Sequence, residues 1–154
     1  MKKKGTNIYM KNTALLIDTN VILDWRLKRE PFFENAETII ELCMHGKLRG
    51  FLACHSILNL FYILRKELNI IKRKDLLLML CNNFDIIGIN QEMLITVLCS
   101  DNFKDLEDDM QIKCAVDKDL DYIITRNIKD FKNSKVKAIL PEDFLVLWNQ
   151  AEKE

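Results

Sequence analysis

The first strongly patterned segment of this chain is Ala14-Leu15-Leu16-Ile17-Asp18-Thr19-Asn20. Its four leading residues are all apolar, as in a parallel strand that is buried on both faces. Thr19 or Asn20 then caps a helix that we expect to run to about Leu27. A buried strand that passes directly into a helix, with the carboxylate of Asp18 at the junction, is typical of an α/β fold.

The same alternation of strand and helix continues to the end of the chain. Gly and Pro are scarce, four and two, which favours helices joined by short turns. We predict an α/β fold with a central, mainly parallel, five-stranded sheet and helices on both faces. The further strands are expected at 50–54, 85–89, 122–125 and 136–140. The further helices are expected at 35–45, 56–67 with Ser56 as the cap, 72–81, 90–100 with Asn90 as the cap, 106–117, and from Pro141 onward.

Length and charge limit the kind of protein this is. The chain has 154 residues and is 49% hydrophobic, which suits one domain with a real core. We assign that domain to residues 13–150 and assign residues 1–12 to a flexible basic N-terminal arm, in which Met10 is a second candidate for the natural start. The charge is balanced, 23 basic against 23 acidic residues, so the chain is not a general polycation. A local basic groove around an acidic site remains compatible with that balance.

Cysteine usage and hydropathy indicate a cytoplasmic protein. The five cysteines occur singly, with no Cys-x-x-Cys pair, as expected for free thiols in a reducing compartment. His45 and His55 have no partners at ligand spacing, so structural zinc is not expected. The basic start is not followed by an apolar signal segment, and no run approaches the roughly 20 apolar residues of a membrane span. We therefore expect no membrane association.

Four carboxylates fall where strands end or helices begin: Asp18, Asp105, Asp108 and Asp130. In an open parallel sheet the ligand lies at the carboxyl ends of the strands, where we expect these side chains to meet. Clustered carboxylates repel one another unless a cation neutralises them. Oxygen ligands without His or Cys favour Mg²⁺ or Mn²⁺, and the matching chemistry is metal-assisted hydrolysis of a phosphodiester. All four are candidate metal ligands.

Each acid also has an ordinary structural explanation. Asp18 precedes a helix and is suited to cap it, and the acids at 105–109 complement the positive end of a helix dipole. Asp130 lies in a stretch typical of a turn. Within residues 105–109, the helix dipole accounts for two acids better than for four. The residues alone leave both interpretations open.

Polar groups beside Asp130 complete the predicted site. Thr125 and Asn127 offer hydrogen bonds to the carboxylates or to a substrate phosphate, and Thr125 is included among the candidate catalytic residues. Arg126 is the best candidate cation for a substrate phosphate. Asn20 and Asn127 join Arg126 as predicted substrate-binding residues.

Three segments, in order, resemble the motifs of PIN domains. They are Leu16-Ile17-Asp18-Thr19-Asn20-Val21-Ile22-Leu23, Phe103-Lys104-Asp105-Leu106-Glu107-Asp108-Asp109-Met110-Gln111 and Ile124-Thr125-Arg126-Asn127-Ile128-Lys129-Asp130-Phe131. Their spacing fits the family across about residues 13–145. The resemblance implies a three-layer α/β/α Rossmann-like fold and a ribonuclease that depends on Mg²⁺ or Mn²⁺. By position, Asp18, Asp108 and Asp130 match the first, third and fourth acids of the family, with Asp105 as an additional acid.

One position departs from the family pattern. The helix that includes Ser56–Lys66 carries Asn59 where the family usually has Glu. An amide oxygen coordinates metal weakly and brings no charge. We keep Asn59 in the predicted catalytic set and expect metal binding weaker by about 1–2 kcal/mol, at an effective dielectric near 20. His55 beside it is expected to be a structural histidine.

Three functions are open on these residues. The first is a metal-dependent endoribonuclease that acts as the toxin of a type II toxin–antitoxin pair, because many small single-domain PIN proteins are toxins of the VapC type. The second is a PIN-fold binding module that is catalytically weakened by Asn59. The third, a phosphohydrolase with Asp18 as nucleophile, is disfavoured because Asn20 leaves no Asp-x-Asp motif.

The expected partners are RNA, a cognate antitoxin and a second copy of the chain. The helices around Leu60-Phe61-Tyr62 and Leu76–Leu80 carry more apolar side chains than one small core is expected to bury. This excess predicts a homodimer, or a groove for an antitoxin segment, with simple core packing as the alternative.

Overall fold

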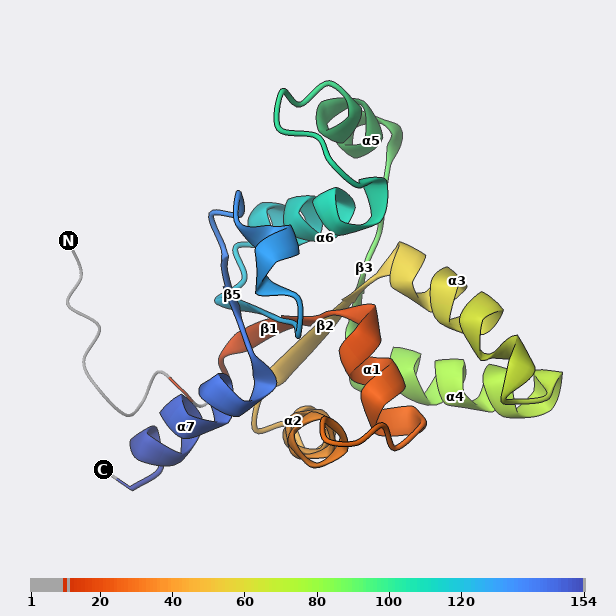
Figure 1. The fold of residues 1–154 in the computed structure, drawn as a ribbon, viewed down its shortest axis with the longest axis vertical. Coiled ribbons are helices and arrows are strands. Elements are labelled where there is room, and N and C mark those ends of the chain that lie inside the picture. The colour runs from red at the N-terminus through yellow and green to blue at the C-terminus, as the bar shows by residue number, and fades with distance from the viewer. Residues whose placement is uncertain (1–9, 11, 154) are drawn as a thin grey trace.

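A sheet of five parallel strands forms the centre of the computed structural model, which describes Met10 and residues 12–153 (Figure 1). The strands lie in the order β3-β2-β1-β4-β5, and every neighbouring pair is parallel. This arrangement confirms the predicted α/β class and the five-stranded sheet. The strands are β1 Ala14–Ile17, β2 Arg49–Ala53, β3 Asp85–Ile87, β4 Tyr122–Ile124 and β5 Lys137–Ile139.

Seven α-helices and two short 3-10 helices within the described residues cover both faces of the sheet. Helices α5 and α6 pack on one face, and α1, α2, α3, α4 and α7 pack on the other (Figure 1). The fold therefore has the expected three layers. The helices are α1 Thr19–Arg26, α2 Phe33–Met44, α3 Cys54–Ile63, η1 Leu64–Lys66, α4 Ile70–Asn83, α5 Gln91–Leu98, α6 Leu106–Asp117, η2 Ile128–Phe131 and α7 Pro141–Ala151.

The alternation of side chains along β1 divides the core into two halves. Leu15 and Ile17 belong to the core that includes α1, α2 and α7, whereas Ala14 and Leu16 belong to the core that includes α6. All four are buried, because β1 is the central strand and both of its faces are covered. This double burial is the reason that the segment is apolar without a break.

The topological switch point of the sheet lies beside β1. The chain runs from β1 outward through β2 to β3 and then returns to the other side of β1 as β4. At such a point the connections that follow the two central strands diverge, and a crevice opens at the carboxyl ends. Ile17 pairs with Ile124 in register, so Asp18 and Thr125 follow their strands at the same level. The topology therefore brings the first and last predicted motifs together.

Several predicted boundaries between strand and helix were wrong. β2 ends at Ala53 and α3 begins at Cys54, so Ser56 does not cap this helix. Ser56 is instead buried in the first turn, and its hydroxyl has no hydrogen-bond partner among the described residues. α4 begins at Ile70, before the predicted start at 72, because the side chain of Asn69 caps its first turn.

The remaining differences lie at the ends of elements. The strands predicted at 85–89 and 136–140 are shorter, and α2 begins two residues before the predicted start at 35. Of the predicted arm, residues 1–9 and 11 lie outside the described residues. Met10 packs against the core, and the N–H of Asn12 donates to the backbone oxygen of Lys47 at 3.2 Å. No helix in the described part of the chain is long and apolar enough to span a bilayer.

Candidate functional site

Asp18 follows β1 directly and occupies the N-cap position of α1, but its side chain does not cap that helix. Oδ1 accepts a hydrogen bond from Gln111 Nε2 at 3.0 Å, and Oδ2 accepts one from Thr125 Oγ1 at 3.0 Å. Asp18 is only 4% exposed. A carboxylate buried to this degree needs such donors, because burial without partners is costly. One functional group thus joins the end of β1 to α6 and to the end of β4.

The acidic segment at the start of α6 contains acids with different roles. Asp105 is the N-cap, and its Oδ1 accepts from the N–H of Asp108 at 2.9 Å. Asp109 reaches back, and its Oδ2 accepts from the N–H groups of Lys104 and Asp105 at 2.9 and 3.3 Å. Asp105 and Asp109 therefore stabilise the first turn of the helix. The carboxylate of Asp108 takes part in none of these bonds.

The carboxyl of Asp108 lies among other acids. The pKa of Asp108 is raised from 3.8 to about 7. The largest cause is burial, followed by the negative charges of Asp105, Asp18, Asp130 and Glu107. Acids from three separate segments are thus close enough to act on one carboxyl group. Such an excess of negative charge is the condition that a divalent cation relieves.

The segment after β4 supplies further predicted residues. Thr125 is buried, its N–H donates to the oxygen of Ile139 at 3.1 Å, and its Oγ1 accepts from the N–H of Asn127 at 3.0 Å. Asn127 immediately precedes η2, and its backbone oxygen accepts from the N–H of Asp130 at 3.0 Å. Asn127 and Asp130 are exposed, whereas Asn20 is half-buried on the first turn of α1. The short turn therefore holds Asp130 near the end of β4.

Arg126, the predicted phosphate ligand, is engaged with a buried carboxylate. Its Nη2 donates to Asp24 Oδ1 at 3.1 Å, and its Nε lies 2.6 Å from Asp24 Oδ2 as an ion pair without hydrogen-bond alignment. Asp24, on α1, is 1% exposed. Burial raises the pKa of Asp24, and the charges of Arg126 and Arg29 oppose that rise. The guanidinium of Arg126 also lies over the ring of Phe32, 4.1 Å from its centroid.

His55 and Asn59 lie one turn apart on the same face of α3. His55 Nε2 is 3.1 Å from the backbone oxygen of Glu107, and this contact joins α3 to the start of α6. Burial lowers the pKa of His55, so the neutral ring is favoured and its Nε2–H donates to that oxygen. Asn59 is half-buried. Because it shares the face of His55, Asn59 lies on the side of α3 that is turned toward the acids.

Two residues of the site were absent from the sequence-based prediction. Gln111 lies three positions after Asp108 on α6, a spacing that places both side chains on one helix face and was a usable signal. Asp24 lies in the last turn of α1 and is followed by Trp25 and Arg26, and an acid near a helix end is ordinarily exposed. Its burial therefore had no local signal.

The residues present suit a divalent cation. Among the described residues, no three His, Cys, Asp or Glu side chains are already arranged as a metal-binding group. The donor chemistry fits nevertheless, because Asp18, Asp108 and Asp130 offer hard oxygen atoms and their repulsion falls on Asp108. Gln111 Oε1 is buried without a partner in the described chain, although Nε2 of the same amide is bound to Asp18. A carbonyl oxygen that is free at this point would be available to accept a hydrogen bond if a hydrated cation occupied the site.

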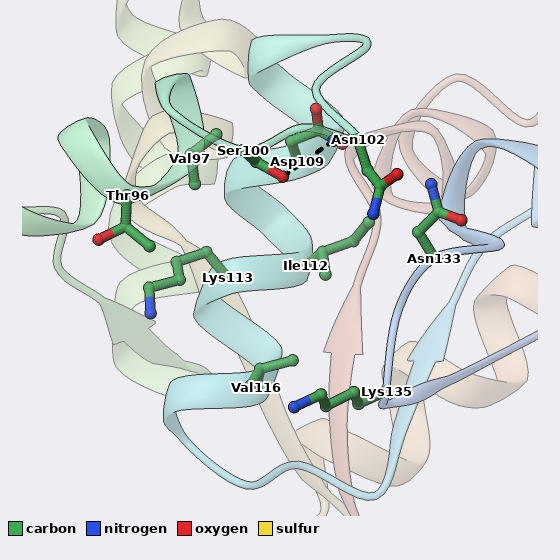
Figure 2. Close-up of a pocket in the computed structure, with 10 residues that line it drawn as sticks. All are labelled: Thr96, Val97, Ser100, Asn102, Asp109, Ile112, Lys113, Val116, Asn133 and Lys135. Atoms are coloured by element: carbon green, nitrogen blue, oxygen red, sulfur yellow. Dashed lines mark hydrogen bonds between the residues drawn. The ribbon is translucent and has the colours of Figure 1, made fainter.

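A separate pocket of about 230 Å³ lies on a different face of α6 (Figure 2). Asp109 lines it, but Asp108 and Gln111 do not. The pocket is therefore distinct from the acidic site. Its other walls come from α5, the segment between α5 and α6, the rest of α6 and the segment between η2 and β5. They include Val97, Ser100, Asn102, Ile112, Lys113, Val116, Asn133 and Lys135.

Comparisons with known proteins agree with this architecture. Residues 14–129 match a family model described as PIN domain. A toxin–antitoxin complex from Klebsiella pneumoniae contains a chain that is 22% identical, with a TM-score of 0.62, over 82% of this chain and 97% of that one. A chain of VapBC-1 from nontypeable Haemophilus influenzae is 15% identical, with a TM-score of 0.62, over 84% of this chain and 99% of that one. A chain of DNA-bound VapBC from Salmonella typhimurium is 14% identical, with a TM-score of 0.61, over 84% of this chain and 98% of that one. At these identities the likeness shows the fold. No curated protein sequence gives a significant match.

Proposed function

Since the chain belongs to the PIN domain family, we propose that it is a Mg²⁺- or Mn²⁺-dependent endoribonuclease and the toxin of a type II toxin–antitoxin pair. One observation carries the proposal. Asp18 follows the central strand at the switch point of the sheet, and the charges of Asp18 and Asp130 contribute to the raised pKa of Asp108. The structural likeness to toxin–antitoxin complexes supports the choice of biological role.

In the proposed site, Asp18, Asp108 and Asp130 hold the divalent cation. When bound, the cation supplies polarisation of the phosphodiester and a lowered pKa for the attacking water. Gln111 and Thr125 orient the carboxylate of Asp18, because each donates to a different one of its two oxygens. A cation binds the ionised carboxylate of Asp108. Because the pKa of Asp108 is about 7 without metal, cation binding near neutral pH has to displace a proton from part of the molecules.

The substrate we propose is RNA in the cytoplasm. Asn127 is exposed beside the acids and Asn20 is half-buried on α1, so both remain proposed substrate contacts through their amide groups. Asn59 contributes no charge, and activity is therefore expected to need more metal than in a site with Glu at that position.

The proposed protein partners are a cognate antitoxin and a second copy of the chain. Exposed apolar side chains occur on both α3 and α4; we call this set the α3–α4 surface. Exposed apolar surface of this kind marks protein-binding sites. Leu60, Leu76 and Leu80 are buried, so the core accounts for only part of the apolar excess in these helices. The α3–α4 surface consists of Leu58, Phe61, Tyr62, Ile63, Ile70, Ile71 and Leu78.

The test of the nuclease proposal is cleavage of structured and single-stranded RNA by the full chain, with Mg²⁺ or Mn²⁺ and with EDTA. We expect Asp18→Ala and Asp108→Ala to lose cleavage. Asp143→Ala, at an exposed acid in the first turn of α7, is a matched control and should cleave like the natural sequence. Cleavage that persists in Asp18→Ala or in EDTA contradicts the proposal.

A second candidate function is a metal-poor binding module, favoured by Asn59. Isothermal titration with Mn²⁺ separates the two candidates. Saturable binding that is lost in Asp108→Ala supports the nuclease. Absence of binding, together with unchanged RNA after incubation, supports the binding module.

A further inference from the structure

Arg126, whose side chain is 25% exposed, forms an ion pair with the buried Asp24 beside the acidic site. Two nitrogens of the guanidinium contact the two oxygens of Asp24, at 3.1 and 2.6 Å, and the ring of Phe32 lies against the guanidinium plane. Such a planar cation is held in one orientation by the carboxylate and by the aromatic ring together. Arg126 therefore has a fixed position.

Both members of the pair are directly linked to residues of the acidic site. Asp24 lies on α1, the helix that begins immediately after Asp18. Arg126 follows Thr125, whose hydroxyl donates to Asp18 Oδ2 at 3.0 Å. It also precedes Asn127, whose N–H donates to Thr125 Oγ1 and whose oxygen accepts from the N–H of Asp130. The ion pair thus anchors the middle of a hydrogen-bonded segment that runs from Asp18 to Asp130.

We infer that Asp24 and Arg126 are positioning residues, a latch that fixes residues 125–130 against α1 so that Asp18 stays oriented and Asp130 stays beside Asp108. Their role is to hold the acids in place, and neither residue touches the reacting phosphate. The inference rests on the proposed function in one respect, namely that the acids so positioned bind metal.

Charge considerations favour the latch over direct binding of substrate by Arg126. Asp24 is 1% exposed and needs a counter-charge. Its other cationic neighbour, Arg29, lies 3.8 Å away and has a side chain that is 39% exposed, so Arg126 is the main partner. An RNA phosphate that took over the guanidinium would leave the buried Asp24 with only the more distant and more exposed Arg29 as a counter-charge. The pairing with Asp24 therefore opposes transfer of the guanidinium to a substrate phosphate.

The experiment compares four variants with the natural sequence: Asp24→Asn, Arg126→Gln, the double variant and Arg126→Lys. Arg29→Gln is the matched control. Arg29→Gln removes the distant cation from the same carboxylate and leaves the close one. Three quantities are measured on the full chain, well below its melting temperature: amide hydrogen exchange at Asn127 and Asp130, the Kd for Mn²⁺, and kcat and KM for RNA. The N–H groups of Asn127 and Asp130 report on the hydrogen bonds that the latch protects.

We expect Asp24→Asn and Arg126→Gln each to speed exchange at these two amides and to lower kcat by about 10- to 100-fold, as for a small misplacement of catalytic groups. The Kd for Mn²⁺ should rise, while KM for RNA changes little. The double variant should be no worse than either single variant, because both remove one interaction. Arg126→Lys keeps the charge but lacks the planar fork, so its exchange rates should be intermediate. Arg29→Gln should behave like the natural sequence.

A different pattern overturns the latch. If Asp24→Asn leaves exchange and kcat unchanged while Arg126→Gln raises KM, Arg126 is a substrate ligand. Uniformly faster exchange throughout the chain, with no preference for residues 125–130, shows that the pair only stabilises the fold. If the natural sequence neither binds Mn²⁺ nor cleaves RNA, the proposed function fails, and the exchange comparison still decides the latch. If Arg126→Gln does not fold, Arg126→Lys and Asp24→Asn provide the same comparison.

Discussion

Replacement of Asp108 by Asn is expected to stabilise the metal-free protein at about pH 8. The pKa of Asp108 is about 7 in the folded protein, against an ordinary value of 3.8. A carboxyl whose pKa is raised by folding destabilises the native state when it is ionised. The stability cost is therefore absent below the unfolded pKa, grows as the pH rises, and is complete above the folded pKa.

The size of the effect follows from two opposing contributions. A rise from 3.8 to about 7 corresponds to a ceiling of about 4 kcal/mol at about 1.36 kcal/mol per pKa unit. Solvent screening of this half-buried side chain reduces that ceiling, and we take about 2 kcal/mol. The acid in the first turn of α6 also gains about 0.3–1 kcal/mol from the helix dipole, which Asn forgoes. Burial and repulsion therefore outweigh the dipole by about 1 kcal/mol, or about 2–4 °C in Tm.

Differential scanning calorimetry in EDTA, from about pH 5 to about pH 8.5, measures this difference across the relevant range. Glu107→Gln is the matched control, because it removes the same charge from the adjacent exposed position and should stay within about 0.5 kcal/mol. Saturating Mn²⁺ should reverse the order, since the natural sequence gains about 2.7 kcal/mol at a hundred times Kd and Asp108→Asn gains less. The reasoning is refuted if Asp108→Asn is no more stable than Glu107→Gln at pH 8, or if its advantage is the same at pH 5.

Three further changes have defined expected outcomes. Asn59→Glu should tighten Mn²⁺ binding by about 1–2 kcal/mol, roughly 5- to 30-fold in Kd, and should raise the cleavage rate; an unchanged Kd in isothermal titration contradicts the placement of Asn59 beside the acids. Gly50→Ala should lower the free energy of unfolding by about 1–3 kcal/mol in urea, because its β-carbon would lie 2.5 Å from ring atoms of Phe84. Gly88→Ala, with no atom within 4 Å of the added carbon, is the matched control and should change stability little. Leu58→Glu on the α3–α4 surface should weaken self-association in size-exclusion chromatography with light scattering, and a monomeric natural sequence argues against the homodimer.

Local pattern was sufficient for the order of most elements. The unbroken apolar run at 14–17 indicated a strand that is covered on both faces, and β1 is the central strand of the sheet. Asn90 caps α5 through its side chain, and Pro141 opens α7 at the first helical position, both as predicted. Prediction failed where a cap gives no side-chain signal. α3 begins after Ala53, and the nearby Ser56, which has the right chemistry for a cap, lies inside the helix.

The acids themselves followed from sequence order, but their roles did not. Asp105 and Asp108 are both acids in one segment, yet Asp105 caps the helix while Asp108 carries the repulsion of its neighbours. The difference depends on which carboxylate reaches a backbone N–H and which one faces Asp18. Sequence spacing placed the two side chains on one helix face but did not distinguish their roles.

The sequence by itself determined the α/β class, the PIN-like motifs and the set of acids at the strand ends, because these depend on periodicity and on residue type over a few neighbouring positions. Only the tertiary structure decided which partners the buried carboxylates of Asp18 and Asp24 have. Thr125 meets Asp18 across 107 positions, and Arg126 meets Asp24 across 102. Contacts of that range arise only when β4 returns beside β1 at the switch point, and they place Arg126, the predicted phosphate ligand, against the buried carboxylate of Asp24.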